Sequence, residues 1–193
     1  MFLFLIKNFS VYYSKEIISP KNLNLVIKKS SMVFLRGPST SGKSTLLKVL
    51  SGVFDYDKYK VTGNIFFNGD DILNSTYDKK KLLNSVFYLP SSPEDVFYKN
   101  KLLDEFLSFG INENVIINFF YDFGLNLSLL DKNPSQLSGG QKRICAIIIA
   151  LAKKPNILLM DNALAGLDDF FSDICIKNLK KLCTTNKSTI VLT

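Results

Sequence analysis

Apolar residues gather in short runs separated by turn-forming residues over the first part of the chain. The runs are Phe2–Ile6, Val11–Tyr13, Leu23–Ile27 and Met32–Leu35. Short apolar runs bounded in this way are typical of strands in an antiparallel sheet. Val61–Phe67 has the same character and ends at Asn68-Gly69, a strong turn signal. We therefore expect an antiparallel β flank at the N-terminus.

Farther along, continuous apolar strands alternate with helices. Apolar residues recur at helical spacing in Thr45–Leu50, Lys101–Phe109, Val115–Phe123, Ile144–Ala152 and Asp169–Leu182, and the last should turn Ile174, Ile176, Leu179 and Leu182 inward. Continuous apolar strands are expected at Ser85–Leu89, Ile157–Met160 and Thr189–Thr193. Such strands followed by helices favour a parallel sheet covered on both faces. The pattern predicts a single α/β domain over residues 1–193, with a mainly parallel sheet and a helical insert at about residues 92–140.

The composition agrees with one compact domain, because 193 residues with 47% hydrophobic content can bury a substantial core. No apolar run approaches the roughly 20 residues of a membrane helix. The opening run Met1–Ile6 lacks the flanks of a signal peptide, which favours a first strand. The cysteines Cys145, Cys175 and Cys183 form no C-x-x-C pair and indicate reduced, mostly buried thiols. We expect a soluble cytoplasmic protein that reaches a membrane only through partner subunits.

Charge and residue usage exclude several functions. The formal charge is +7, but only two of the 24 basic residues are arginine and the lysines are scattered, so no nucleic-acid partner is expected. The chain contains no histidine. Ser-His-Asp catalysis, Cys-His catalysis and His-ligated metal sites are therefore excluded.

Residues 37–45 read GPSTSGKST and match G-x-x-x-x-G-K-[ST], between an apolar strand and a helix. This pattern predicts a P-loop NTPase core in which main-chain N–H groups cradle a β-phosphate. Lys43 would bridge the β- and γ-phosphates, and the Ser44 hydroxyl would ligate Mg²⁺. The predicted binding residues for ATP are Gly37, Pro38, Ser39, Thr40, Ser41, Gly42, Lys43, Ser44 and Thr45.

A P-loop alone fits kinases, GTPases and motor ATPases equally well. The strand Ile157–Met160 narrows the choice because it ends in an acid, Asp161. A hydrophobic strand beside the P-loop strand would place this carboxylate as a second Mg²⁺ ligand, directly or through a water.

Residues 137–141 read LSGGQ and are followed by Lys142, Arg143 and an apolar helix. With this motif between the P-loop and Asp161, the chain resembles the ABC ATPase family over essentially its whole length. A helix N-terminus attracts anions through its unpaired N–H groups and its dipole. The resemblance implies that two chains sandwich two ATP molecules, and that Leu137, Ser138, Gly139, Gly140 and Gln141 contact the γ-phosphate bound to the opposite subunit.

Two further segments match the family. Ala165-Gly166-Leu167-Asp168 resembles its D-loop, which implies that Asp168 acts across the same interface. Tyr13 falls where the family stacks an aromatic residue on adenine, although Tyr12 is a neighbouring candidate and a plain strand residue is an open alternative.

The stretch Ser92–Asn112, SPEDVFYKNKLLDEFLSFGIN, is more narrowly similar to energy-coupling-factor importers, although its Pro, Glu and Phe occur in many importers. The resemblance implies membrane permease subunits as partners. They would dock near Ser91–Phe97 and the helical insert, at the inner face of the membrane.

Three departures from the family pattern bear on hydrolysis. Asn162 stands where the family has a catalytic glutamate, and Ser91 stands where it has a glutamine. The chain ends at Thr193, one residue before the family's switch histidine, so we expect either a truncated chain or a shortened subunit. General-base assistance is worth about 10²–10⁴-fold in rate. We therefore predict a subunit that binds ATP tightly, hydrolyses it poorly and lends its LSGGQ to a catalytically complete partner.

Two other functions remain open from the sequence. One is a soluble ABC ATPase outside transport, such as an assembly ATPase for iron–sulfur clusters or a nucleic-acid-associated ATPase. The other is a nucleotide-binding regulatory subunit that does not hydrolyse ATP. The leading interpretation is a subunit whose ATP-driven dimerisation powers a membrane transporter.

Overall fold

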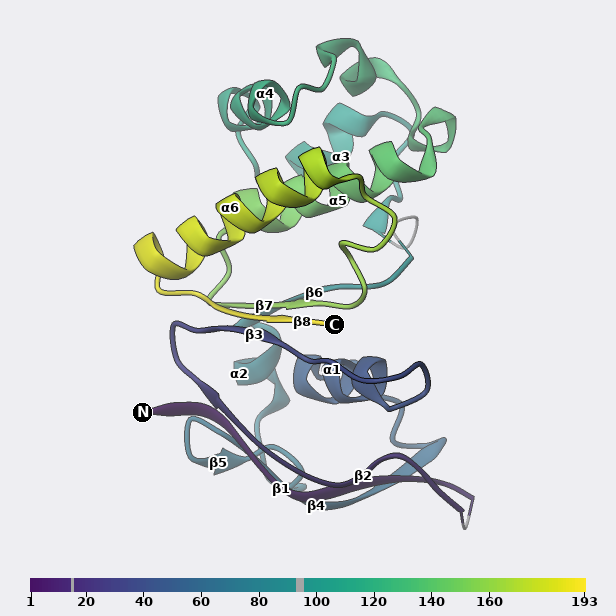
Figure 1. Ribbon diagram of the computed structural model, residues 1–193, viewed down its shortest axis with the longest axis vertical. Coiled ribbons are helices and arrows are strands. Elements are labelled where there is room, and N and C mark those ends of the chain that lie inside the picture. The colour runs from purple at the N-terminus through teal and green to yellow at the C-terminus, as the bar shows by residue number, and fades with distance from the viewer. Residues whose placement is uncertain (15, 93–95) are drawn as a thin grey trace.

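The computed structural model describes residues 1–14, 16–92 and 96–193. Figure 1 shows a layered molecule with an antiparallel sheet at the bottom, a parallel sheet across the middle and helices above and between them. The antiparallel sheet has the order β2-β1-β4-β5. Its strands are β1 (Phe2–Tyr13), β2 (Glu16–Lys28), β4 (Tyr59–Phe67) and β5 (Asp70–Asp71). The expected antiparallel flank is therefore confirmed.

The N-terminal strands are fewer and longer than the apolar runs indicated. Phe2–Ile6 and Val11–Tyr13 belong to one strand, because β1 continues through Asn8 (φ 48°) with register shifts against both neighbouring strands. A bulge lets a strand absorb an irregular residue without ending. The predicted turn after Val61–Phe67 is confirmed, since Asn68 (φ 53°) and Gly69 (φ 104°) both adopt positive φ between β4 and β5.

The second sheet has the order β3-β8-β7-β6 and every pairing in it is parallel. Its strands are β3 (Met32–Phe34), β6 (Val86–Leu89), β7 (Ile157–Met160) and β8 (Thr189–Leu192). The run Met32–Leu35 was expected in the antiparallel flank, and this is wrong. It pairs with β8, more than 150 residues later, because Met32 packs against the core that contains α5 and Val33 against the core that contains α1.

Helices cover both faces of the parallel sheet, as expected. α1 (Lys43–Ser51) and α2 (Lys79–Leu83) lie between the two sheets, and α5 (Gly139–Lys153) and α6 (Asp169–Thr185) cover the other face (Figure 1). In β7, Ile157 and Leu159 join the core beside α1, whereas Leu158 and Met160 join the core beside α5. The outer layer contains α3 (Leu102–Ser108), α4 (Glu113–Asp122) and the 3₁₀ turns η2 (Leu127–Asp131) and η3 (Pro134–Gln136).

The buried face of α6 differs from the expected one. Cys175, Leu179 and Leu182 are buried, but Ile174 and Ile176 are only half-buried. The buried residues are spaced by four and three positions, so they form one narrow stripe, and both isoleucines lie at its margins.

All three cysteines are free, and Cys145 and Cys175 are buried. Burial raises the pKa of each of these two thiols to about 12, which confirms that they are protonated core residues. No helix in the described part of the chain is long and apolar enough to cross a membrane.

Parallel strands end at a common edge of the sheet, and this edge positions the site. In the orientation of Figure 1 the strands point to the right, where the loop between β3 and α1 lies. Chain segments after β6, β7 and β8 reach the same edge. Ligands of open α/β sheets bind outside the carboxyl ends of the strands, so functional side chains are expected there.

Candidate functional site

A cavity of about 470 Å³ opens at the carboxyl edge of the parallel sheet. It combines the loop before α1 with residues that follow three other strands. Its walls are formed by Ile18, Ser19, Ser39, Thr40, Ser41, Gly42, Lys43, Ser44, Thr45, Ser91, Asp161, Asn162 and Thr193. The structure thus brings together most of the predicted P-loop, both predicted catalytic positions and the predicted Mg²⁺ ligands.

The P-loop depends on glycine at its last turn. Gly42 has φ 84° and is the N-cap of α1, and a Cβ atom there would lie 2.4 Å from the main-chain nitrogen of Pro20. Both the backbone conformation and the approach of β2 therefore require glycine. The helix begins at Lys43, so its unpaired N–H groups and positive dipole end face the cavity.

Lys43 places a positive charge within the curve of this loop. Its Nζ donates hydrogen bonds to the carbonyl oxygens of Gly37 and Pro38, each at 2.9 Å, and to Ser41 Oγ at 3.3 Å. Main-chain amides and an ammonium group converging on one concave loop form a site for a polyphosphate.

The two predicted metal ligands are in direct contact. Ser44 Oγ donates a hydrogen bond to Asp161 Oδ1 at 2.9 Å, although the residues are 117 positions apart. Thr193 Oγ1 donates to the same oxygen at 3.0 Å, and the Tyr88 hydroxyl donates to Oδ2 at 3.3 Å. A buried carboxylate beside a serine hydroxyl supplies the oxygen ligands that Mg²⁺ prefers, so the residues present fit this ion.

Asn162 and Ser91 line the same cavity, as expected for residues in the catalytic positions. Asn162 has a left-handed backbone with φ 50°, a conformation that asparagine tolerates better than most residues. Its N–H donates to Thr193 Oγ1 at 2.8 Å. Of the described residues that line the cavity, Asp161 alone has a side-chain carboxylate, and it is already engaged with Ser44 and Thr193.

The LSGGQ segment forms the N-terminus of α5. Ser138 is the N-cap, its Oγ accepts a hydrogen bond from the Gln141 N–H at 3.2 Å, and Gln141 Oε1 accepts one from the Ser138 N–H at 3.0 Å. This reciprocal capping box explains the serine and the glutamine. It does not explain the glycines, because a Cβ on Gly139 or Gly140 would meet nothing within 4 Å.

The signature and the D-loop segment lie side by side on this chain. Gly140, Gln141, Gly166, Leu167 and Asp168 line a second cavity of about 360 Å³, and none of residues 137–141 is among the described residues lining the first one. The Asp168 side chain caps α6 by accepting from the Phe171 N–H at 2.9 Å. Leu137 was expected to contact nucleotide, but the residue is 5% exposed and packed in the core, so that contact stays a prediction.

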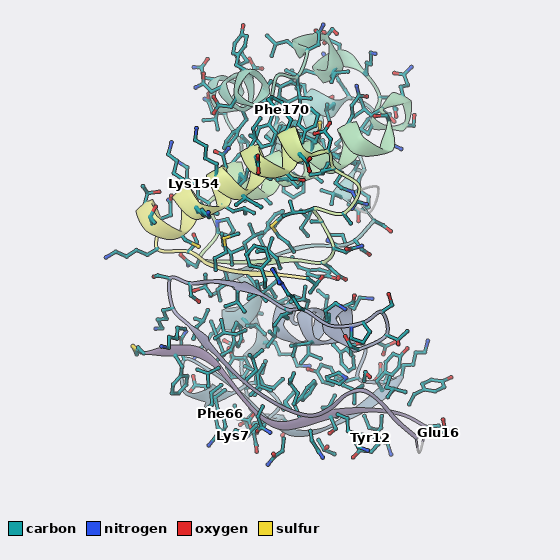
Figure 2. The ribbon with its side chains drawn as sticks, in the orientation of Figure 1. Lys7, Tyr12, Glu16, Phe66, Lys154 and Phe170 are labelled. Atoms are coloured by element: carbon teal, nitrogen blue, oxygen red, sulfur yellow. The ribbon has the colours of Figure 1, made fainter. Side chains whose placement is uncertain are left out.

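Tyr13 lies at the end of β1 and is 51% exposed. Its ring packs against Tyr59 at a centroid distance of 5.6 Å, and Lys58 Nζ lies 5.9 Å from the ring centroid. Figure 2 shows Tyr12 and Glu16 at the same end of the antiparallel sheet. Tyr13 is not among the described residues that line the cavity, whereas Ile18 and Ser19 of β2 are, so adenine stacking by Tyr13 stays a prediction.

Comparison with known proteins identifies the family to which this chain belongs. A model of the ABC transporter family matches residues 20–165, which include the P-loop, Asp161 and LSGGQ. The chain belongs to the ABC transporter family. It is an ATP-binding domain of the ABC type, and the α/β fold and ATPase class expected from the sequence are confirmed.

Relatives of this ABC domain are ATP-binding subunits of transporters. It is 29% identical to the energy-coupling factor transporter ATP-binding protein EcfA2 of Caldanaerobacter subterraneus subsp. tengcongensis, over 97% of this chain and 68% of that protein. It is 30% identical to the phosphate import ATP-binding protein PstB of Thermotoga maritima, over 97% of this chain and 78% of that protein.

A solved structure of a similar ATP-binding cassette is dimeric. This ABC domain matches the dimeric structure of a post-hydrolysis state of an ATP-binding cassette bound to ADP and Pi. The TM-score is 0.79 at 26% identity, over 98% of this chain and 86% of that one.

The residues of the ABC domain's site that were not predicted from the sequence include Ile18, Ser19, Tyr88, Arg143 and Thr193. Thr193 hydrogen-bonds both Asp161 and the Asn162 amide, and Arg143 hydrogen-bonds the carbonyl oxygen of Asn162 at 2.9 Å. Their sequence signals were weak, since Arg143 is one of only two arginines and Thr193 simply ends an apolar strand.

Proposed function

We propose that this chain binds Mg²⁺ and ATP at Gly37–Thr45 and, paired with a second ABC ATPase subunit, powers a membrane permease. The observation that carries the proposal is the hydrogen bond between Ser44 and Asp161, beside Lys43 in the P-loop. The names of the relatives EcfA2 and PstB support a transporter as the setting.

In this proposal the chain's own residues bind and orient ATP. The α1 amides hold the β-phosphate, and Lys43 moves from the Gly37 and Pro38 carbonyl oxygens toward the β- and γ-phosphates. Ser44 and Asp161 hold Mg²⁺, which neutralises charge on the phosphate oxygens when bound. Tyr13 is the proposed adenine contact.

Hydrolysis in this chain's own site is proposed to be slow. A water aligned for attack needs a base within hydrogen-bond reach, and Asn162 and Ser91 supply only neutral oxygens. Loss of a general base costs about 10²–10⁴-fold in rate, or about 3–5 kcal/mol of barrier. ATP binding and dimer closure would then be this chain's main contribution, with hydrolysis supplied mostly by the partner's site.

The signature suits a partner's nucleotide because Ser138, Gly139 and Gly140 are exposed and are not among the described residues that line this chain's own cavity. We propose that Ser138, Gly139, Gly140 and Gln141 complete the partner's site together with Asp168. Permease subunits would dock near Ser91–Phe97 and the helical insert, holding the chain at the inner face of the membrane. Residues 93–95 of that segment lie outside the described part of the chain.

Binding of a fluorescent ATP analogue, with and without Mg²⁺, tests the site. Lys43→Ala should weaken binding at least about tenfold through loss of the charge-assisted phosphate contact. Lys48→Ala is the matched control, because Lys48 is exposed in the last turn of the same helix. Equal affinity of both variants would refute the proposed ATP site.

The steady-state ATPase rate, measured for the chain alone and then with a candidate partner, tests whether the partner's site carries most of the hydrolysis. We expect slow turnover alone and a marked increase with the partner. Robust turnover by the isolated chain would overturn the proposal of a weak own site.

A further inference from the structure

Arg143 joins three segments that are distant in the sequence. Its Nη1 donates to the carbonyl oxygens of Asn162 at 2.9 Å and Ala165 at 2.7 Å, and its Nη2 donates to the carbonyl oxygen of Ser91 at 3.3 Å. The acceptors lie 19, 22 and 52 residues from Arg143. A guanidinium group is planar, permanently charged and rich in donors, so one side chain can hold several carbonyls at once.

The three carbonyls belong to functionally different parts of the molecule. Ser91 and Asn162 line the nucleotide cavity, whereas Ala165 opens the D-loop segment. Arg143 itself lies in the second turn of α5, just after the signature Leu137–Gln141. One side chain therefore connects the P-loop cavity with the D-loop segment and with the helix that begins at the signature.

The Asn162 peptide groups are restrained from both sides. The N–H donates to Thr193 Oγ1 at 2.8 Å, and the carbonyl oxygen accepts from Arg143 at 2.9 Å. Since Asn162 adopts a left-handed φ of 50°, these two bonds oppose its relaxation toward the common conformations. Hydrogen bonds therefore join the loop after β7 to α5 through Arg143 and to the end of β8 through Thr193.

We propose that Arg143 is a positioning residue that couples the nucleotide cavity to the signature and the D-loop. A displacement of Ser91 or Asn162 on ATP binding is transmitted through the guanidinium to Ala165–Asp168 and to the start of α5. Arg143 is not among the described residues that line the P-loop cavity or the cavity beside the signature. The inference rests on the proposed binding of ATP at Gly37–Thr45.

Hydrogen–deuterium exchange of the full chain, with and without Mg²⁺ and ATP, tests this coupling. A direct ATP titration measures the Kd of each variant in parallel. In Arg143→Met, exchange of the Asn162–Asp168 amides should rise about tenfold or more because their anchor is lost, while the Kd for ATP changes less than about twofold. ATP should protect residues 137–142 in the wild type but not in Arg143→Met. Arg143→Lys should fall between them, because an ammonium group cannot span all three carbonyls.

Lys153→Met is the matched control on the same helix. Lys153 Nζ also donates to a carbonyl, that of Phe109 at 2.9 Å, but this contact lies away from the cavity and the signature. It should leave both exchange readouts at the wild-type level.

Three results would overturn the coupling: wild-type exchange in Arg143→Met, ATP protection of residues 137–142 that survives in it, or no such protection in the wild type. If Arg143→Met does not fold, Arg143→Lys carries the test, and wild-type behaviour of that variant would overturn the three-carbonyl bridge. Failure of the wild type to bind ATP would instead refute the proposed function. The exchange comparison without nucleotide would still test whether Arg143 anchors the loop.

Discussion

Replacing Gly140 by alanine separates folding from function in the signature. Gly140 is in the first turn of α5, and an added Cβ would meet no atom within 4 Å. Alanine favours a helix over glycine by up to about 1 kcal/mol. For a chain of this size that gain corresponds to a rise in Tm of about 2–4 °C. We therefore expect Gly140→Ala to be as stable as the wild type or slightly more stable.

The same methyl group should abolish the contact with a second subunit. In the proposed dimer the signature amides approach the partner's phosphates, and a methyl group on this face would hold the two apart. We expect ATP-dependent association to fall at least about tenfold, equivalent to about 1.4 kcal/mol. Binding of ATP to this chain's own P-loop should not change, because Gly140 does not line that cavity.

Thermal unfolding measures the Tm, and titration with a fluorescent ATP analogue measures ATP affinity. Sedimentation velocity with Mg²⁺ and ATP measures association. Sedimentation is done with the second subunit, or with the chain alone if it pairs with itself. Ser135→Ala, an exposed change just before the signature, is the control and should resemble the wild type. A Tm lowered by several degrees would refute the open space at Gly140. Unchanged association would refute the role of the signature in a partner's site.

Two further predictions concern hydrolysis and alkaline stability. Asn162→Glu should raise the steady-state ATPase rate by up to about 10²–10⁴-fold if the absent base limits turnover. The left-handed φ of 50° should cost this variant about 1–2 kcal/mol of stability. An unchanged ATPase rate would show that another step limits turnover. The free energy of unfolding should fall as pH rises from about 9 toward about 12, because unfolded cysteines lose protons in this range while burial raises the pKa of Cys145 and Cys175 to about 12. Urea unfolding at pH 8 and pH 10.5 checks whether the free energy of unfolding falls, and Cys145→Ala should reduce its dependence on pH. Thiol reagents should modify half-buried Cys183 before Cys145 and Cys175.

Much of the candidate site was predictable because its motifs are local. Gly37–Thr45 requires a tight glycine turn directly between a strand and a helix, and Ser138–Gln141 requires a capping box at a helix start. Both requirements are met within a few residues of the chain. The signature was correctly expected at a helix N-terminus, but the apolar run Ile144–Ala152 marked only the later part of α5, because Gly139 and Gly140 have weak helix propensity.

The contacts between motifs could not be predicted in the same way. Arg143 binds carbonyl oxygens, which every residue possesses, so no pattern of residue types marks its partners. Leu137 belongs to the signature but is buried in the core that also contains Ile144, which the motif alone did not show.

For this protein, the sequence by itself determined the α/β class, the phosphate loop, the signature and the unusual residues Ser91 and Asn162, since each depends on short-range periodicity or on residue identity. Only the tertiary structure decided that β3 pairs with β8, that Ser44 meets Asp161 and that Arg143 reaches the loops after β6 and β7. These contacts join residues that are 19 to 158 positions apart, and they form because helices on both faces bury the parallel strands and bring the ends of those strands to one edge.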